Sequence, residues 1–305
     1  MVTGGAGFIG SHIVDALLAA GYSVAVIDNL STGKRENVNP AARFHHVDIR
    51  DAVAVDAVFE QEHPAVVSHQ AAQADVRASV VDPAGYAESN IIGTINLLQA
   101  AKSARTRKFI FASTGGAVYG NPEELPASER CPTRPLDPYG VSKLACEFYL
   151  DTYLRNFGLD YCALRYANVY GPRQDGNGEA GVVAIFAKGM LENRDLTIWG
   201  DGRQSRDFVY VEDVAAANVA AAQVGSGIYN IGTGLPTDIV TIARILQHTI
   251  GYTKEVNLGP AKLGEVRHTY LDSHKARREL GWEPRMGLRE GLARTVESLK
   301  LKIGD

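Results

Sequence analysis

Short apolar runs alternate with longer amphipathic stretches along the first half of the chain. Runs with the length and composition of buried strands lie at Val24–Ile27, Phe44–Val47, Ala65–Ser68, Lys108–Ala112 and Tyr161–Leu164. Helical stretches lie near Ser11–Ala20, Val53–Gln61, Tyr86–Ser103 and Pro138–Asn156. In Tyr86–Ser103, Ile91, Ile95 and Leu98 recur at i, i+4 and i+7, the spacing of one buried helix face. The alternation predicts an α/β fold, a doubly wound parallel sheet covered on both faces.

The pattern loosens after residue 166, where Gly, Pro and Arg collect in short runs such as Tyr170-Gly-Pro-Arg173 and Gly200-Asp-Gly-Arg203. We expect a sheet domain over residues 1–166, with later segments near 205–223 returning to it. Residues 167–305 would form mainly a smaller, interleaved lobe that binds substrate through its loops. Only Met1 and Val2 precede Thr3, so either the first strand is very short or the true start lies upstream.

Composition and charge exclude several classes of protein. Hydrophobic residues make up 45% and charged residues 22%, which excludes a disordered chain. The formal charge of −4 gives no reason to expect nucleic acid or an anionic membrane as partner. We see no signal peptide and no membrane span. Cys131, Cys146 and Cys162 lack metal-type spacing and are typical of reduced thiols in a cytoplasmic protein. The eight histidines show no metal-ligand pattern.

The segment Gly4-Gly-Ala-Gly-Phe-Ile-Gly10 joins an apolar start to a helical run. Glycines at such a turn let the backbone approach a pyrophosphate, as in a Rossmann-type fold. Asp28 ends the next strand, 18 residues past Gly10, close to the spacing expected for the acid that binds the adenosine ribose. A carboxylate there would repel a 2′-phosphate, so we expect NAD rather than NADP. The alternative is that Asp28 only opens a turn.

Tyr139 and Lys143 are four residues apart after Pro138, so they share one face of a helix. A free Tyr is a poor base, with a reference pKa of about 10. A neighbouring ammonium and an oxidised nicotinamide would favour the phenolate and make Tyr139 a general base. The alternative is an exposed Tyr/Lys pair on a helix surface.

With these motifs in this order, the chain resembles the extended short-chain dehydrogenase/reductase family, and within it nucleotide-sugar epimerases of the UDP-glucose 4-epimerase type. Further runs that fit are Asp28-Asn-Leu-Ser-Thr-Gly33, His69-Gln-Ala-Ala72, Asn90-Ile-Ile-Gly-Thr94, Arg165-Tyr-Ala-Asn-Val-Tyr-Gly-Pro-Arg173 and Arg206-Asp-Phe-Val-Tyr-Val-Glu-Asp213. The cofactor residues that the motifs and the resemblance together indicate are Gly4, Gly7, Phe8, Ile9, Gly10, Asp28, Asn29, Asp48, Ile49, Gln70, Ala71, Ala72, Asn90, Tyr139, Lys143 and Tyr166.

The resemblance implies a mechanism. Tyr139 takes the proton of the sugar 4-hydroxyl while hydride passes from C4 to NAD⁺, and Thr114 hydrogen-bonds the same oxygen. Lys143 holds the nicotinamide ribose. The 4-keto sugar turns over and takes hydride back on its other face, so the cofactor stays bound. Counting back from Tyr119-Gly120 places the hydroxyl residue at Gly115, whereas counting from Phe111 or Tyr139 gives Thr114, which we prefer because Gly has no hydroxyl.

The loop after Thr114 is Gly115-Gly116, whereas related 4,6-dehydratases carry an Asp-Glu pair there; this favours an epimerase. By resemblance, Asn168 and Arg206 bind the diphosphate, and Trp199 with Thr197 lines the uracil site. An ordinary core aromatic at Trp199 and a surface ion pair at Arg206 are the alternatives. These assignments make a UDP-sugar the expected substrate.

Two further positions bear on the substrate. Lys262 and Glu265 stand where the family usually has Arg and Asp, and we expect somewhat weaker phosphate binding from Lys262, since it lacks the bidentate fork. Thr269 occupies the position that gates the sugar pocket, where a small residue admits N-acetylhexosamines as well as glucose and galactose. The remaining alternatives are a net reductase or dehydrogenase on another nucleotide sugar and a non-catalytic NAD-binding protein. The family also implies a homodimer through Tyr86–Ser103 and Pro138–Asn156.

Overall fold

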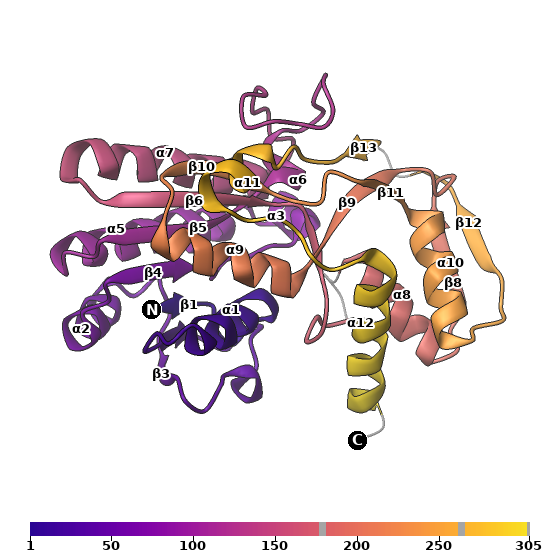
Figure 1. The fold of residues 1–305 in the computed structure, drawn as a ribbon, viewed down its shortest axis with the longest axis horizontal. Coiled ribbons are helices and arrows are strands. Elements are labelled where there is room, and N and C mark those ends of the chain that lie inside the picture. The colour runs from indigo at the N-terminus through magenta and orange to yellow at the C-terminus, as the bar shows by residue number, and fades with distance from the viewer. Residues whose placement is uncertain (177–180, 262–265, 304–305) are drawn as a thin grey trace.

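A parallel sheet forms the centre of the molecule (Figure 1). The computed structural model describes residues 1–176, 181–261 and 266–303. Within these ranges seven strands pair in the order β10-β6-β5-β4-β1-β2-β3, all parallel. Their bounds are β1 Val2–Thr3, β2 Ala25–Asp28, β3 Arg43–His46, β4 Val66–His69, β5 Lys108–Thr114, β6 Asp160–Tyr166 and β10 Gly227–Ile231. The predicted doubly wound parallel sheet is confirmed.

Helices cover both faces of this sheet because successive strand residues point to opposite sides. Val26 packs into the core under α1 and α9, whereas its neighbour Ile27 packs into the core under α2, α5 and α7. The bounds of the five helices are α1 Phe8–Ala19, α2 Ala52–Glu62, α5 Gly93–Ser103, α7 Pro138–Phe157 and α9 Val211–Gln223. The predicted strands and helices of the first half are therefore all present, with ends shifted by a few residues at most.

The predicted helix Tyr86–Ser103 is a composite. It begins in α4 (Pro83–Tyr86), passes through a π-helical segment, η2 (Ala87–Ile92), and continues as α5. Shorter helical segments complete this half: η1 Arg35–Asn37, α3 Val76–Val81 and α6 Gly115–Val118.

A second lobe packs beside the sheet and lies to its right in Figure 1. In it β9 (Ser205–Tyr210) pairs with β7 (Asn168–Tyr170), β11 (Pro236–Asp238) and β13 (His268–Thr269). The strands β8 (Leu196–Trp199) and β12 (Val256–Gly259) form a separate pair. The helices of this lobe are α8 Val182–Leu191, α10 Ile239–Ile250 and α12 Leu288–Ile303, whereas α11 (His274–Leu280) packs on β10 and α9 of the central sheet.

The segment near residues 205–223, expected to return to the sheet domain, is divided between the second lobe and the central sheet. The helix α9 packs on α1, but β9 belongs to the second sheet, and the strand that joins the central sheet is β10. The reason is that α9 follows β9 without a loop, so the chain crosses from lobe to sheet inside 205–223. The domain division at residue 166 stays a prediction.

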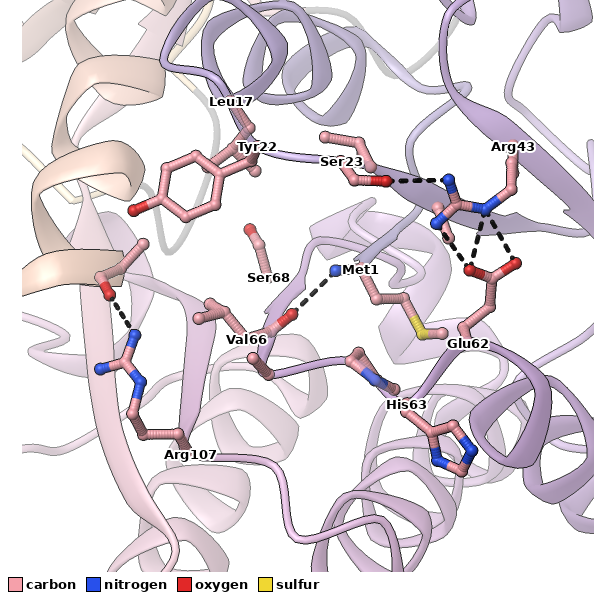
Figure 2. A pocket seen from close by; sticks show the side chains of 15 residues that line it. Met1, Leu17, Tyr22, Ser23, Arg43, Glu62, His63, Val66, Ser68 and Arg107 are labelled. Carbon is pink, nitrogen blue, oxygen red and sulfur yellow. Dashed lines mark hydrogen bonds and ion pairs between the residues drawn. The ribbon is translucent and has the colours of Figure 1, made fainter.

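The first strand is two residues long, whereas its neighbours β2 and β4 each have four. The Met1 amine donates to Val66 O over 2.8 Å. A cavity of about 300 Å³ lies beside it, lined by the first residues of β2 and β4 and by Arg43, Glu62 and Arg107 (Figure 2). Burial lowers the pKa of this amine to about 5.

Candidate functional site

The glycine loop between β1 and α1 forms a cradle at the carboxyl end of the sheet, where the strand order reverses. Gly4 has φ +67°, and a Cβ there would lie 2.6 Å from the backbone nitrogen of Ala71, so only glycine fits. Gly7 precedes α1 without a side-chain cap. The first N–H groups of α1 are therefore available to an anionic group, and the loop backbone can approach it closely.

Acidic residues lie beside this cradle at the ends of β2 and β3. Asp28 accepts from Ala6 N at 2.9 Å and from Leu30 N at 2.8 Å, which fixes its carboxylate against the glycine loop. Asn29 Nδ2 donates to Asp48 Oδ2 at 2.9 Å. Hydrogen bonding to Arg50 holds the pKa of Asp48 well below its usual range. The arrangement keeps the Asp48 carboxylate ionised and places both carboxylates beside the glycine loop, where sugar hydroxyls could donate to them.

A cavity of about 390 Å³ joins these elements. Of the residues expected to hold the cofactor, those that line it are Gly4, Gly7, Phe8, Ile9, Gly10, Asp28, Asn29, Asp48, Ile49, Gln70, Ala71, Ala72, Tyr139, Lys143 and Tyr166. The cavity also has lining residues that sequence reasoning missed, among them Ser31, Thr32 and Gly33. The run Asp28-Asn-Leu-Ser-Thr-Gly33, already noted as family-like, was the signal for them.

Asn90 does not line this cavity. It is 2% exposed, its Oδ1 accepts from Gln73 N at 2.8 Å, and its Nδ2 donates to Gln73 O and Ser142 Oγ. Its amide is occupied in tying the loop after β4 to α7. In this geometry Asn90 holds the backbone of Gln73, which lines the cavity, and does not itself reach the cavity.

Tyr139, Lys143 and Thr114 meet where β5 ends. Tyr139 is in the first turn of α7, whose N-cap residue Asp137 accepts a hydrogen bond from Gly140 N. Pro138 fits the first position of this helix because it has no backbone N–H, and an N–H there would have no acceptor within the helix. Lys143 Nζ donates to Ala112 O at 2.8 Å and lies 4.8 Å from the centre of the Phe111 ring. Thr114 hydrogen-bonds Tyr139 through its side chain. Gly115 is the first residue of α6 and offers no such group.

Burial dominates the protonation of this pair. It raises the pKa of Tyr139 to about 12, against the smaller opposing effect of the hydrogen bond from Thr114. It lowers the pKa of Lys143 to about 8. By itself the site therefore holds Tyr139 as a neutral phenol, and further positive charge is needed to make it a base at neutral pH.

Five of the residues expected to bind substrate, Asn168, Thr197, Trp199, Arg206 and Thr269, lie in the second lobe and do not line the 390 Å³ cavity, whereas Tyr139 does. Asn168 begins β7 and is exposed; Thr197 and Trp199 lie on β8, and Trp199 is 44% exposed. Arg206 Nη1 donates to Ser205 O at 2.9 Å. Thr269 lies opposite Arg206 in the β13–β9 pair. Lys262 and Glu265 lie outside the described residues.

One observation brings this lobe close to the residues proposed for catalysis. A Cβ on Gly116 would lie 3.8 Å from Thr114 Oγ1 and 4.0 Å from Asn168 Oδ1, so both oxygens face the space beside Gly116. Thr269 is 3% exposed, and its hydroxyl is buried without a hydrogen-bond partner in the described residues. In those ranges no group of three or more His, Cys, Asp or Glu could hold a metal ion.

Comparisons with known proteins cover the whole chain. Residues 1–232 match the model of the NAD dependent epimerase/dehydratase family. The UDP-glucose 4-epimerase of Mycolicibacterium smegmatis is 42% identical over 308 residues, covering 99% of this chain and 98% of that one. The crystal structure of UDP-glucose 4-epimerase with UDP-glucose from Thermotoga maritima has a TM-score of 0.97 at 48% identity, covering 99% and 98%. The Thermus thermophilus UDP-glucose 4-epimerase in complex with NAD has a TM-score of 0.94 at 47% identity, covering 98% of each chain.

Proposed function

Because the chain belongs to the NAD dependent epimerase/dehydratase family, as its motifs indicated, we propose that it is an isomerase that inverts C4 of a UDP-hexose. The observation that carries this proposal is the cluster of Thr114, Tyr139 and Lys143 beside the glycine cradle. The substrates in view are UDP-glucose and UDP-galactose, the sugars of the relatives with similar structures.

The cradle fits NAD. The glycine positions leave no room for side chains, the start of α1 has free N–H groups for a pyrophosphate, and Asp28 faces the adjoining cavity. The Asp28 carboxylate would repel a 2′-phosphate, which favours NAD over NADP. Bound there, NAD supplies a hydride acceptor and, through its positive ring, the charge that Tyr139 needs.

The chain's own residues handle the proton. Tyr139 would remove the proton of the 4-hydroxyl, and Thr114, already hydrogen-bonded to Tyr139, would hold the same oxygen. Lys143, anchored to Ala112 O, would bind the nicotinamide ribose and favour the phenolate. After the 4-keto sugar turns and C4 takes hydride back on its other face, Tyr139 would return the proton to the C4 oxygen, which completes the inversion and regenerates the site.

The lobe residues would hold the nucleotide. Arg206 and Asn168, with Lys262 and Glu265, are proposed for the diphosphate and ribose, and Thr197 with Trp199 for uracil. The small Thr269 would leave space for an N-acetyl group, so UDP-N-acetylhexosamines are included in the proposal.

A second candidate is a net reductase or dehydrogenase on another nucleotide sugar, since Tyr139 and Lys143 serve that chemistry too. The loop after Thr114 is the observation that favours the epimerase over a dehydratase, because neither Gly115 nor Gly116 offers a carboxylate. A non-enzymatic NAD-binding protein is a distant third, since a pure binder does not need the buried Tyr139–Thr114 contact.

We further propose a homodimer through α7 and the helix formed by η2 and α5. Large apolar side chains face water there: Ile92 is 49% exposed, Val141 50% and Phe148 66%. Val141 and Phe148 are seven residues apart and lie on one face of α7, and an exposed apolar face of this kind is typical of an interface. Analytical ultracentrifugation should give twice the monomer mass, and Phe148→Glu should give the monomer.

No helix within the described ranges is long and apolar enough to cross a membrane. Cys131, Cys146 and Cys162 are free thiols. Reduced thiols support the proposal of a cytoplasmic location.

The experiment that tests the function is incubation of the purified protein with UDP-galactose and no added NAD, followed by ion-pair chromatography. Formation of UDP-glucose to a fixed ratio supports an epimerase that retains its cofactor. If no conversion occurs even with NAD added, while added NADH or NADPH is consumed with another nucleotide sugar, the reductase is the better assignment.

A further inference from the structure

A row of polar side chains crosses three neighbouring strands directly behind the candidate active site. Ser113 on β5 lies opposite Arg165 on β6, and Arg165 lies opposite Asn230 on β10. The next residues along β5 and β6 are Thr114 and Tyr166, which lie opposite each other in the same register. Along β5 and β6, the polar row therefore comes one residue before Thr114 and Tyr166, which are proposed to contact substrate and cofactor.

Glu147 connects this row to α7. Its carboxylate accepts a hydrogen bond from Ser113 Oγ at 2.5 Å. It also accepts two hydrogen bonds from the Arg165 guanidinium, from Nε at 2.9 Å and from Nη2 at 2.6 Å. The side chains of Arg165 and Glu147 are each 3% exposed. Arg165 Nη1 also donates to Tyr119 Oη at 2.8 Å, and Tyr119 donates to Asn230 Oδ1 at 2.7 Å. The charges are thus buried, paired and linked to a continuous network.

The spacing on α7 shows what this network holds. Tyr139, Lys143 and Glu147 follow one another at intervals of four, so they share one face of the helix. Each contacts a different residue at the end of β5: Tyr139 contacts Thr114, Lys143 contacts Ala112 O and Glu147 contacts Ser113. Three polar contacts therefore fix α7 against the last three residues of β5.

A buried ion pair adds little stability compared with apolar residues of the same size, because desolvation offsets the attraction. What a fully satisfied network does provide is a single geometry. We propose that Glu147 is a positioning residue: with Ser113 and Arg165 it holds the end of β5 at the distance from α7 that keeps Thr114 on Tyr139. The expected change in kcat rests on the proposed function, whereas the expected change in the position of the end of β5 does not.

Two variants test this together: Ser113→Ala removes one contact and leaves the ion pair intact, and Glu147→Gln alters the network at a residue that, unlike Ser113, does not line the 390 Å³ cavity. In Ser113→Ala we expect kcat for UDP-galactose to fall about 10-fold, with KM within twofold, since small displacements of reacting groups are costly to the chemical step. The pH profile of kcat should shift to higher pH, because Tyr139 loses part of its hydrogen bond from Thr114. Glu147→Gln should have the larger effect, and Glu147→Asp should restore less than half of the lost activity.

The matched control is Asp160→Asn, which breaks a second ion pair on the same two strands. Lys108 and Asp160 lie opposite each other at the other end of β5 and β6, with Nζ to Oδ2 at 2.6 Å. The melting temperature of this variant should fall, as that of Ser113→Ala does. Its kcat and the pH profile of kcat should stay at the wild-type values. Wild-type values of kcat, KM and pH profile in both Ser113→Ala and Glu147→Gln would overturn the inference.

Amide hydrogen exchange separates this inference from the proposed function. It should be faster at the end of β5 in Ser113→Ala than in the wild type, and unchanged there in Asp160→Asn. If the wild type fails to convert any UDP-sugar, the proposed function fails, and exchange alone decides the positioning role. Unchanged exchange at the end of β5 in Ser113→Ala would count against it.

Discussion

Leu271 closes the space over Gly115: a Cβ built on Gly115 would lie 2.5 Å from Leu271 Cδ1. The next residue, Gly116, faces the open space between Thr114 Oγ1 and Asn168 Oδ1 instead. Two adjacent glycines thus have different roles. Position 115 is closed by packing, and position 116 leaves room where the sugar is proposed to lie.

Gly115→Ala and Gly116→Ala should therefore differ. Gly115→Ala forces Leu271 to move and should destabilise the protein by about 1–3 kcal/mol, the usual range for an overpacked core. Gly116→Ala should leave stability within about 0.5 kcal/mol, while raising KM for the UDP-sugar because its methyl group narrows the proposed sugar site. Thermal unfolding and steady-state kinetics measure the two effects, and equal behaviour of the two variants would contradict this account.

Tyr139→Phe should reduce kcat by about 10²–10⁴-fold, the range for loss of a general acid or base. Folding and bound NAD should be retained, because the substitution removes one hydroxyl from the cavity lining and leaves the glycine loop and Asp28 in place. Tyr149→Phe is the matched control, since Tyr149 lies on the same helix but is 40% exposed. Chromatography of the UDP-sugars gives kcat, and absorbance after denaturation gives the NAD content. Substantial epimerisation by Tyr139→Phe would exclude Tyr139 as the base.

Thr269 tests the size of the sugar pocket. Thr269→Tyr should lower activity on UDP-N-acetylglucosamine relative to UDP-galactose, because the larger ring would fill the space proposed for the N-acetyl group. Thr269→Val has the same shape but lacks the hydroxyl, which is buried without a partner in the described residues, so it should be neutral or stabilising. An unchanged ratio of the two activities in Thr269→Tyr would remove the basis for including N-acetylhexosamines.

Local patterns in the sequence predict much of the fold and the pair of residues proposed for catalysis. The alternation of apolar runs and amphipathic stretches is a local consequence of strand and helix periodicity, so the sheet and its helices were predictable from it. Gly10 and Asp28 belong to one α1–β2 unit, and Tyr139 and Lys143 belong to one helix, α7, so both spacings are local. All four residues line the same cavity.

Contacts between distant segments decided the rest. The bond of Asn90 to Ser142, the Leu271 side chain over Gly115 and the bridge from Glu147 to Ser113 and Arg165 join residues from different elements. No periodicity records which polar group meets which, because those distances are set by how helices pack on the sheet. For the same reason the sequence did not show that β10 pairs with β6 or that the hydroxyl of Thr114 meets Tyr139. The sequence alone determined which reactive groups the chain has, and tertiary packing decided which of these groups lie close enough to act together.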